Sequence, residues 1–333
     1  GGYVPMRQNE QASYDIKKSQ VPSDRWGPDL TLTRDDGHTV TFATIPNCIR
    51  MATGNFNSCV MFRDGAVATG SGTLYGYQVP SGNYQYNWLS DNWENIVDMF
   101  MPTTYLRGVL PQVAIMSDNT LVGIDLTHPT LMASPTTILT DLKRIRAVNQ
   151  GHTGDMICET NDGSLYWIYG YGINSPNQWR ADKMNLGVSG DEIAFMSLGD
   201  YSGCCRVVLK ENLRQTRTTH TTRTLNGPPT IPHGLFAKEN FDSDLLDITS
   251  NELCFTYARE NEVSLYSYYT NKGYTNDTST WGDHIRAIGS TAYGVIHKYA
   301  SGYYVGVAPW QGGETFEQSK NMTALEKHLI DNS

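Results

Sequence analysis

Residues 142–172 read LKRIRAVNQGHTGDMICETNDGSLYWIYGYG. Two runs of β-forming residues, 144–148 and 156–160, come before an Asn-Asp-Gly turn at 161–163, and a third run follows at 165–169. Such turn residues between β-forming runs are typical of tight hairpins. The stretch therefore predicts three short antiparallel strands in succession.

The same pattern returns along the chain at a roughly fixed interval. An isoleucine in the first predicted strand serves as a reference, and each one precedes a second β-rich run and a polar turn. The steps between these isoleucines are 47, 49, 48, 55 and 37 residues, and the isoleucines are Ile49, Ile96, Ile145, Ile193, Ile248 and Ile285. A sheet of three or four strands repeated at this spacing is typical of a propeller blade.

We therefore expect an all-β fold, a β-propeller with six blades. A hairpin at 30–34 and 38–42, turning on Asp35-Asp36-Gly37, would make a seventh blade if it paired with the last strands. An open sandwich is the alternative fold, although a closed ring protects strand edges better. The expected divisions are a polar arm at 1–27, the propeller at 28–312, and a tail at 313–333 whose capping-box pattern predicts a short helix.

Two repeats resemble a known family. Residues 163–174, GSLYWIYGYGIN, and 51–65, MATGNFNSCVMFRDG, are similar to the repeat of the regulator-of-chromosome-condensation propellers. That family places a small residue or cysteine on the strand before an Asp-Gly turn. The resemblance implies a propeller fold and leaves open an exchange-factor or protein-interaction role.

Composition narrows the class of partner. The 333 residues carry a formal net charge of −9, which argues against nucleic acid as a partner because phosphate binding needs a basic face. We also expect no membrane insertion, because the chain has no apolar run of about 18 residues. Cysteines at 59, 158, 204 or 205, and 254 fall on corresponding second strands, which favours buried small residues over disulfides.

Three segments, 76–93, 169–179 and 266–281, are rich in tyrosine, tryptophan and asparagine. Such residues suit recognition loops, although aromatic rings also fill gaps between blades. A Thr/Arg-rich segment at 214–223 predicts either a site for phosphates or acidic sugars or an edge strand protected by charge. The candidate ligand-binding residues are Tyr84, Tyr86, Trp88, Trp93, Tyr171, Asn174, Trp179, Tyr269, Tyr274, Trp281, Arg217 and Arg223.

Signatures of catalysis and of cofactors are missing from the sequence. The eight histidines never fall in pairs at metal-ligand spacing, so we expect neither a metal nor another cofactor. A glycosidase would need two carboxylates from separate blades. Candidates for that alternative are Asp98, Asp155, Asp200, Asp247 and Asp283.

The leading hypothesis is a non-catalytic recognition propeller, the receptor- or glycan-binding head of a phage or virion attachment protein such as a tail fibre or spike. Its location would be the virion or the extracellular space, and its partners a cell-surface receptor or glycan and other virion proteins. Self-association into a homo-oligomer stays open. The alternatives are an intracellular protein-interaction or exchange-factor propeller and a glycoside hydrolase.

Overall fold

The computed structural model describes residues 29–33, 39–43, 48–53, 57–62, 66–71, 85–88, 96–100, 111–125, 136–148, 155–171, 178–199, 204–219, 230, 233–250, 254–267, 272–290, 294–307 and 315–318. These residues form strands β1 to β26 and the short 3-10 helix η4 (Gly190–Glu192). All strand pairs within the sheets are antiparallel, and they build one two-stranded and six four-stranded sheets. The chain is therefore mainly β, as its sequence predicts.

The six larger sheets are here called sheets I to VI in chain order. Within each, the strands lie side by side in the order of the sequence, so every sheet is a meander. The two-stranded sheet is β1 (Asp29–Thr33) with β2 (Thr39–Ala43). Sheet I is β3 (Cys48–Thr53), β4 (Asn57–Phe62), β5 (Ala66–Ser71) and β6 (Gln85–Trp88); sheet II is β7 (Ile96–Phe100), β8 (Pro111–Met116), β9 (Leu121–Asp125) and β10 (Thr136–Leu139); sheet III is β11 (Leu142–Val148), β12 (Met156–Thr160), β13 (Leu165–Tyr171) and β14 (Gln178–Lys183); sheet IV is β15 (Ile193–Gly199), β16 (Cys204–Leu209), β17 (Asn212–Thr219) and β18 (Phe236–Asn240); sheet V is β19 (Asp247–Ser250), β20 (Cys254–Arg259), β21 (Glu262–Ser267) and β22 (Lys272–Asp277); sheet VI is β23 (His284–Ser290), β24 (Gly294–Tyr299), β25 (Gly302–Val307) and β26 (Thr315–Gln318).

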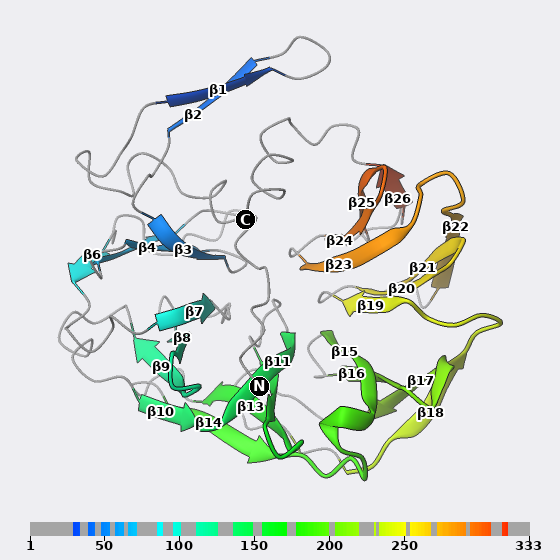
Figure 1. The fold of residues 1–333 in the computed structure, drawn as a ribbon, viewed down its shortest axis with the longest axis horizontal. Helices are drawn as coiled ribbons and strands as arrows, with labels where there is room; N and C mark the ends of the chain where they lie inside the picture. Colours follow the sequence, from blue (N-terminus) through cyan, green and yellow to red (C-terminus); the bar gives the residue numbers. More distant parts are fainter. Residues whose placement is uncertain are drawn as a thin grey trace.

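Figure 1 shows the six sheets arranged radially, like blades, with the first strand of each sheet nearest the centre. The innermost strands of successive sheets contact one another at four boundaries: β3 with β7, β11 with β15, β15 with β19, and β19 with β23. Sheets II and III contact through their outer strands, β10 and β14. This radial arrangement of four-stranded meanders is a β-propeller.

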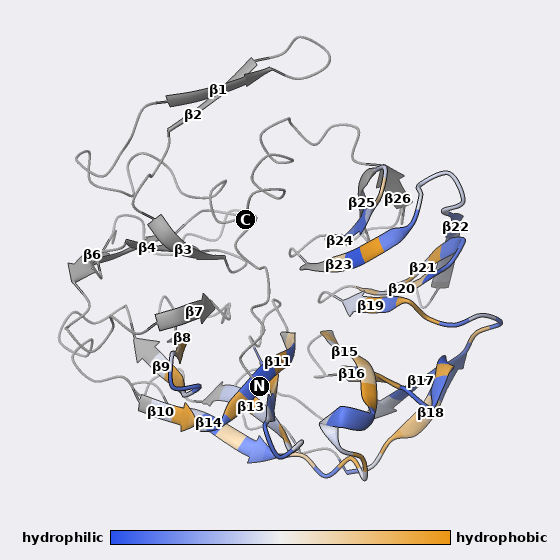
Figure 2. Cartoon of the chain, in the orientation of Figure 1, coloured by the Kyte–Doolittle hydropathy of each residue, from blue (hydrophilic) through white to orange (hydrophobic). Residues whose placement is uncertain are grey.

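The hydrophobic core is divided into layers between neighbouring sheets. One cluster joins sheet II to sheet III, a second joins III to IV, and a third joins IV to V. Second strands have neighbours on both faces, so every residue of β12 (MICET) and of β20 (CFTYAR) is buried. In Figure 2, hydrophobic residues lie along β20 and in the middle of β23. A sheet buried on both faces cannot fold alone, so the stability of each sheet depends on its neighbours.

Tight turns join second to third strands. Between β12 and β13, Gly163 has φ 82°, which glycine adopts without a Cβ penalty. The Asp162 carboxylate stabilises this turn by accepting hydrogen bonds from the Ser164 N–H (3.0 Å), the Ser164 hydroxyl (3.0 Å) and the Thr160 hydroxyl (2.6 Å). These bonds lower the pKa of Asp162 to about 2, chiefly through the Thr160 hydroxyl.

The repeat prediction is confirmed in its main feature, because each of the six reference isoleucines lies on the first strand of a sheet. The cysteines also lie on second strands as predicted, and Cys158, Cys205 and Cys254 are buried. Burial makes such thiols unreactive, because it disfavours the thiolate; it raises the pKa of the Cys254 thiol to about 12.

Three details of the fold were not evident from the sequence. The hairpin β1–β2 pairs with itself and with no other strand among the described residues. Sheet VI continues past the predicted boundary at residue 312, because β26 pairs with β25 inside the predicted tail. Ile285 is 54% exposed, although it stands on a first strand. The predicted arm at 1–27 and the predicted terminal helix lie outside the described residues.

Candidate interaction faces

The meander order gives the propeller two different faces. In an antiparallel meander, the turn between the second and third strands emerges at the same end of the sheet as the connection from the fourth strand to the next sheet. We call this end of the ring the turn face. The connections from first to second and from third to fourth strands emerge at the opposite end, which we call the loop face.

The turn face is acidic. Its described connections are 117–120, 140–141, 161–164, 184–192, 210–211, 241–246, 260–261, 278–283 and 300–301. Lys210 is the one lysine or arginine in these described connections. Exposed acids in the same connections are Asp118, Asp141, Asp162, Asp191, Glu192, Glu211, Asp242, Asp244, Glu260 and Asp283. The turn face therefore presents mainly negative charge to solvent.

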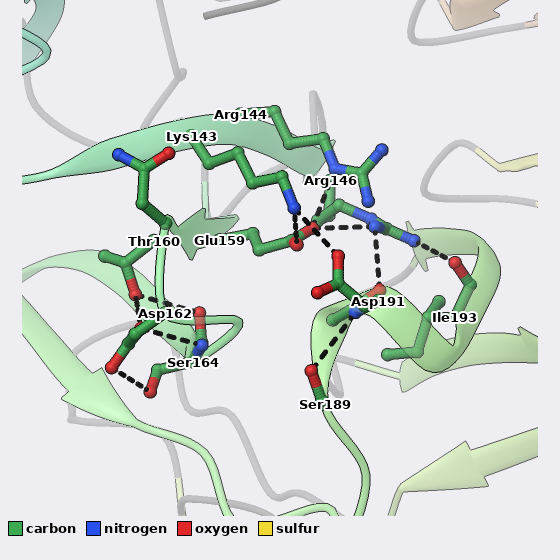
Figure 3. A network of polar contacts seen from close by, with 12 residues as sticks. Lys143, Arg144, Arg146, Glu159, Thr160, Asp162, Ser164, Ser189, Asp191 and Ile193 are labelled. Carbon is green, nitrogen blue, oxygen red and sulfur yellow. Dashed lines mark hydrogen bonds and ion pairs between the residues drawn. The ribbon is translucent and has the colours of Figure 1, made fainter. Parts of the chain in front are cut away.

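A buried carboxylate joins sheets III and IV beneath this face. Figure 3 shows Glu159 of β12 surrounded by three basic side chains of the neighbouring strand β11. Its carboxylate lies 2.7 Å from Arg144 Nε, 2.7 Å from Arg146 Nη1 and 3.2 Å from Lys143 Nζ. The Glu159 side chain is fully buried, and Arg146 is only 5% exposed. The register that pairs Arg144 with Glu159 brings these charges together.

The same cluster reaches sheet IV. Arg146 donates to the carbonyl oxygens of Gly190 (3.2 Å) and Ile193 (2.8 Å), and Lys143 Nζ pairs with Asp191 (2.8 Å). Gly190 is required here, because a Cβ at this position would lie 2.4 Å from the Glu159 carboxyl carbon. The cluster thus fixes the start of β15 against sheet III.

Burial and charge act in opposite directions on Glu159. Burial favours the neutral acid, but the hydrogen bonds from Arg144 and Arg146 outweigh it, and the pKa of Glu159 lies below its ordinary value. Glu159 is therefore ionised at neutral pH. A carboxylate that is buried and fully engaged by cations is unsuited to proton transfer, so this cluster holds the sheets together.

A second polar cluster joins sheets V and VI. The His297 ring is completely buried, with Nε2 2.7 Å from the Thr256 hydroxyl and Nδ1 3.1 Å from His284 Nε2. Burial lowers the pKa of His297 to about 3 and that of His284 to about 4. Both rings are therefore neutral at pH 7.

The same boundary holds a buried carboxylate. Asp247 accepts hydrogen bonds from the N–H groups of Ala287 (2.7 Å) on β23 and of Ile248 (2.8 Å). Burial raises the pKa of Asp247 to about 6, against the effect of these two bonds. A perturbed pKa often marks a reactive group, but a carboxylate bonded to the backbone of the next sheet has an evident structural role.

The structure separates the predicted ligand-binding residues. Tyr84, Trp93, Asn174, Tyr269 and Arg223 lie outside the described residues. Tyr86 and Trp88 lie on β6, Tyr171 ends β13, and Tyr274 lies on β22. Trp281 precedes β23 on the turn face and stacks on Tyr304, with ring centroids 3.7 Å apart. These positions do not form a single surface, because Trp281 and Tyr171 belong to opposite ends of their sheets.

Trp179 fills a gap between sheets, which is the second of the two roles that the sequence allows for its aromatic residues. It lies on β14, is 9% exposed and packs in the core between sheets II and III. Gly123 of β9 leaves room for its ring, since a Cβ there would lie 2.3 Å from Trp179 Cδ1. Trp179 therefore contributes to packing between sheets.

The Thr/Arg segment is not an edge strand over its described part, which corrects the sequence interpretation. β17 pairs with β16 on one side and with β18 on the other, and Thr216 and Thr218 are buried. Arg217 forms an ion pair with Glu211 at 3.1 Å. Strand β18 pairs with β17 and covers the edge that the sequence alone leaves open.

Among the described residues, no two of the candidate catalytic carboxylates contact each other. Asp155 is buried and accepts a hydrogen bond from Trp167 Nε1 at 3.0 Å, while Asp283 is exposed in a connection. Asp247 is bonded to backbone as given above, Asp98 lies on β7, and Asp200 is outside the described residues. Nowhere in the described part of the chain do three or more His, Cys, Asp or Glu residues gather as a metal site. No described helix is long and apolar enough to cross a membrane.

No protein-family model matches the sequence, and no curated protein is significantly similar to it. Among solved structures, human WBSCR16 is similar with a TM-score of 0.53 at 9% identity, over 80% of this chain and 79% of that chain. Prp20p from Saccharomyces cerevisiae has a TM-score of 0.47 at 8% identity, covering 83% and 78%. The propeller domain of Cps50 (Swd1) from Myceliophteria thermophila has a TM-score of 0.42 at 11% identity, covering 83% and 90%. At these identities the likeness concerns the fold alone.

Proposed function

We propose that this chain is a non-catalytic propeller that binds protein partners through its loop face. The sequence offers this role as the protein-interaction alternative, and no comparison favours a virion attachment head. The observation that carries the proposal is topological. The three segments rich in tyrosine and asparagine each span the connection from a third to a fourth strand: β5 to β6, β13 to β14, and β21 to β22.

The described strand ends that these three connections join lie at the same end of the ring. Tyr84, Asn174 and Tyr269 lie in the three connections, one in each. Tyrosine and asparagine supply contact area and adaptable hydrogen bonds at low entropic cost, as in the loops with which antibodies bind proteins. The composition therefore suits a protein epitope.

The scaffold beneath the loops supports the same role. Apolar cores and buried polar clusters join sheets II to VI, so the strand ends of sheets III and V that carry two of the loops are held in fixed positions. Binding loops on a rigid scaffold are a common arrangement in recognition proteins. The buried carboxylates Asp155, Glu159 and Asp247 and the histidines His284 and His297 are engaged in structural contacts, which leaves recognition as the better supported activity.

The test is a triple substitution, Tyr84→Ala, Asn174→Ala and Tyr269→Ala, in the full chain. Partners would be captured from the source cells by cross-linking, and the affinity of each purified partner would be measured directly. We expect the triple variant to bind at least about tenfold more weakly. The control variant, Asn261→Ala with Thr280→Ala, changes exposed residues of the turn face. Equal binding by the triple variant and the native chain would refute the assignment, and so would turnover of a glycan by the purified protein.

We also infer that the ring has six blades, each one of the four-stranded sheets, and that the hairpin β1–β2 is an addition to it. The pairing of β1 with β2 alone supports this count. An experimental structure with β1 or β2 paired to sheet VI would instead give a seven-bladed ring.

A further inference from the structure

A repeated irregularity of the innermost strands exposes two large apolar side chains on the turn face. The register of the first strand shifts near its start in sheets I, II, III, IV and VI. In sheet VI the extra residue is Ile285, between His284 and Arg286. A β-bulge of this kind turns a side chain away from the regular pleat. This explains why Ile285 is 54% exposed.

Sheet V has the equivalent feature at Leu246. The Leu246 N–H donates to the Ala258 carbonyl at 2.8 Å, and the next residue, Asp247, is also paired with Ala258. Two residues therefore stand opposite one, as in a bulge. Leu246 is 43% exposed, whereas its neighbour Leu245 is 1% exposed.

The two exposed side chains belong to one site. Strands β19 and β23 contact each other, and Asp247, next to Leu246, accepts a hydrogen bond at 2.7 Å from Ala287, two residues after Ile285. Backbone hydrogen bonds hold both strand starts in place. Leu246 and Ile285 are thus two large exposed apolar side chains on the starts of neighbouring strands. Exposed apolar side chains that gather in one region mark contact sites more often than scattered ones do.

Acidic residues surround this pair. Asp242 and Asp244 lie in the connection that carries Leu246, Asp283 lies two residues before Ile285, and Glu260 follows β20; all four are exposed. The nearby bases pair with part of this rim: Arg259 with Asp242 (2.5 Å) and Glu262 (2.5 Å), and Arg214 with Asp244 (2.7 Å). Acids still outnumber bases here, because Glu260 and Asp283 add negative charge to the described ion pairs. Arg286, beside Ile285, is partly buried. The surrounding acidic turn face adds to the negative field.

We propose that Leu246 and Ile285, with this acidic rim, form a second docking site for a basic amphipathic segment of a partner protein. The apolar pair needs leucine-like side chains from the partner, and the rim attracts lysine and arginine around them. Nucleic acid and acidic segments are repelled. A second copy of this chain is disfavoured as well, because two acidic faces of a protein with net charge −9 would meet.

The test measures fluorescence anisotropy of the full chain with three short labelled peptides: one alternating lysine with leucine, one glutamate with leucine, and one lysine with serine. We expect the Lys/Leu peptide to bind, and the other two to bind at least about tenfold more weakly. Raising the salt concentration should weaken binding, since the Debye length falls from about 10 Å at 0.1 M to about 3 Å at 1 M.

The decisive variant is Leu246→Ser with Ile285→Ser, which should reduce affinity for the Lys/Leu peptide about tenfold or more. The matched control is Phe236→Ser, an apolar residue 50% exposed on the outermost strand β18, and it should leave affinity unchanged. If the double variant fails to fold, the single variant Ile285→Lys replaces it, because a fixed positive charge should repel the same peptide.

Several outcomes would overturn the proposal: no binding of the Lys/Leu peptide, equal binding of the Glu/Leu peptide, or equal affinity in the double variant. Self-association that is lost in the double variant would assign the site to a second copy of the chain. This site does not depend on the loop face. The Tyr84, Asn174 and Tyr269 variant should bind the Lys/Leu peptide normally, so the two proposals can fail separately.

Discussion

Replacing Glu159 by glutamine tests the idea that a buried charge cluster holds sheets III and IV together. The substitution keeps the size of the side chain but removes its negative charge. Arg146, 5% exposed, and the partly exposed Arg144 and Lys143 would then face one another without Glu159. Asp191 would still neutralise Lys143, at 2.8 Å, but it is bonded to neither arginine.

The expected loss follows from this geometry. Breaking a buried ion pair by removing one partner costs about 3–5 kcal/mol, and we take about 3 kcal/mol because two of the cations are partly exposed. Unfolding entropy of about 2.1 cal/mol/K per residue gives about 0.7 kcal/mol/K for a cooperative chain of 333 residues. The midpoint of thermal unfolding should therefore fall by about 4 °C.

Thermal and urea unfolding followed by circular dichroism would measure this change, with Glu260→Gln as the control. Glu260 is exposed in a turn, so its substitution should change stability by less than about 0.5 kcal/mol. The effect must also depend on pH. Because the folded pKa of Glu159 lies below its ordinary value, its contribution is present at neutral pH and is lost as the pH falls through the folded pKa. A Glu159→Gln protein as stable as the native chain at pH 7, or a penalty independent of pH, would refute the reasoning.

Two further predictions concern a turn and a sheet boundary. In urea unfolding, Gly163→Ala should destabilise the protein by about 1 kcal/mol more than Gly187→Ala. Both glycines have positive φ, but only at Gly163 would a Cβ meet another side chain, Ser189 Oγ, at 2.5 Å. Equal losses of stability in the two variants would contradict this. His284→Gln should flatten the loss of stability between about pH 6.5 and pH 4 by about 2 kcal/mol. The pKa of His284 is lowered to about 4 and that of its neighbour His297 to about 3 in the folded protein. As the pH falls, the unfolded chain therefore binds protons first, and acid favours unfolding. If calorimetry showed the same dependence of stability on pH in the variant and the native chain, this role of His284 would be excluded.

The sequence predicts the strands and turns well because those features depend on residues close together in the chain. Alternating β-formers and turns such as 161–163 are local signals, and they place every first strand correctly. Bulges are less visible, because an extra residue in one strand is defined only by its partner strand. The exposure of Ile285 and Leu246 follows from such bulges, and the isoleucine spacing could not reveal it.

The polar clusters could not be predicted for a related reason. Three bases in β11 are evident in the sequence, but their meeting with Glu159 depends on the register between β11 and β12. The contacts of Arg146 with Gly190 and Ile193 depend further on how two sheets pack. Similarly, nothing local indicates that Trp179 would be buried against Gly123 of the preceding sheet.

The four boundaries from sheets II–III to sheets V–VI differ in their chemistry. Trp179 packs against Gly123 between sheets II and III, and Arg146 bonds to the Ile193 carbonyl between III and IV. Between IV and V the Arg206 guanidinium lies 4.5 Å from the centre of the Phe255 ring, and between V and VI Thr256 meets His297. Identical sheets could pack on one another in any order, whereas these contacts fit only one neighbour each. The divergence that obscures the repeats in the sequence thus has a physical role, because it specifies the order of the sheets around the ring.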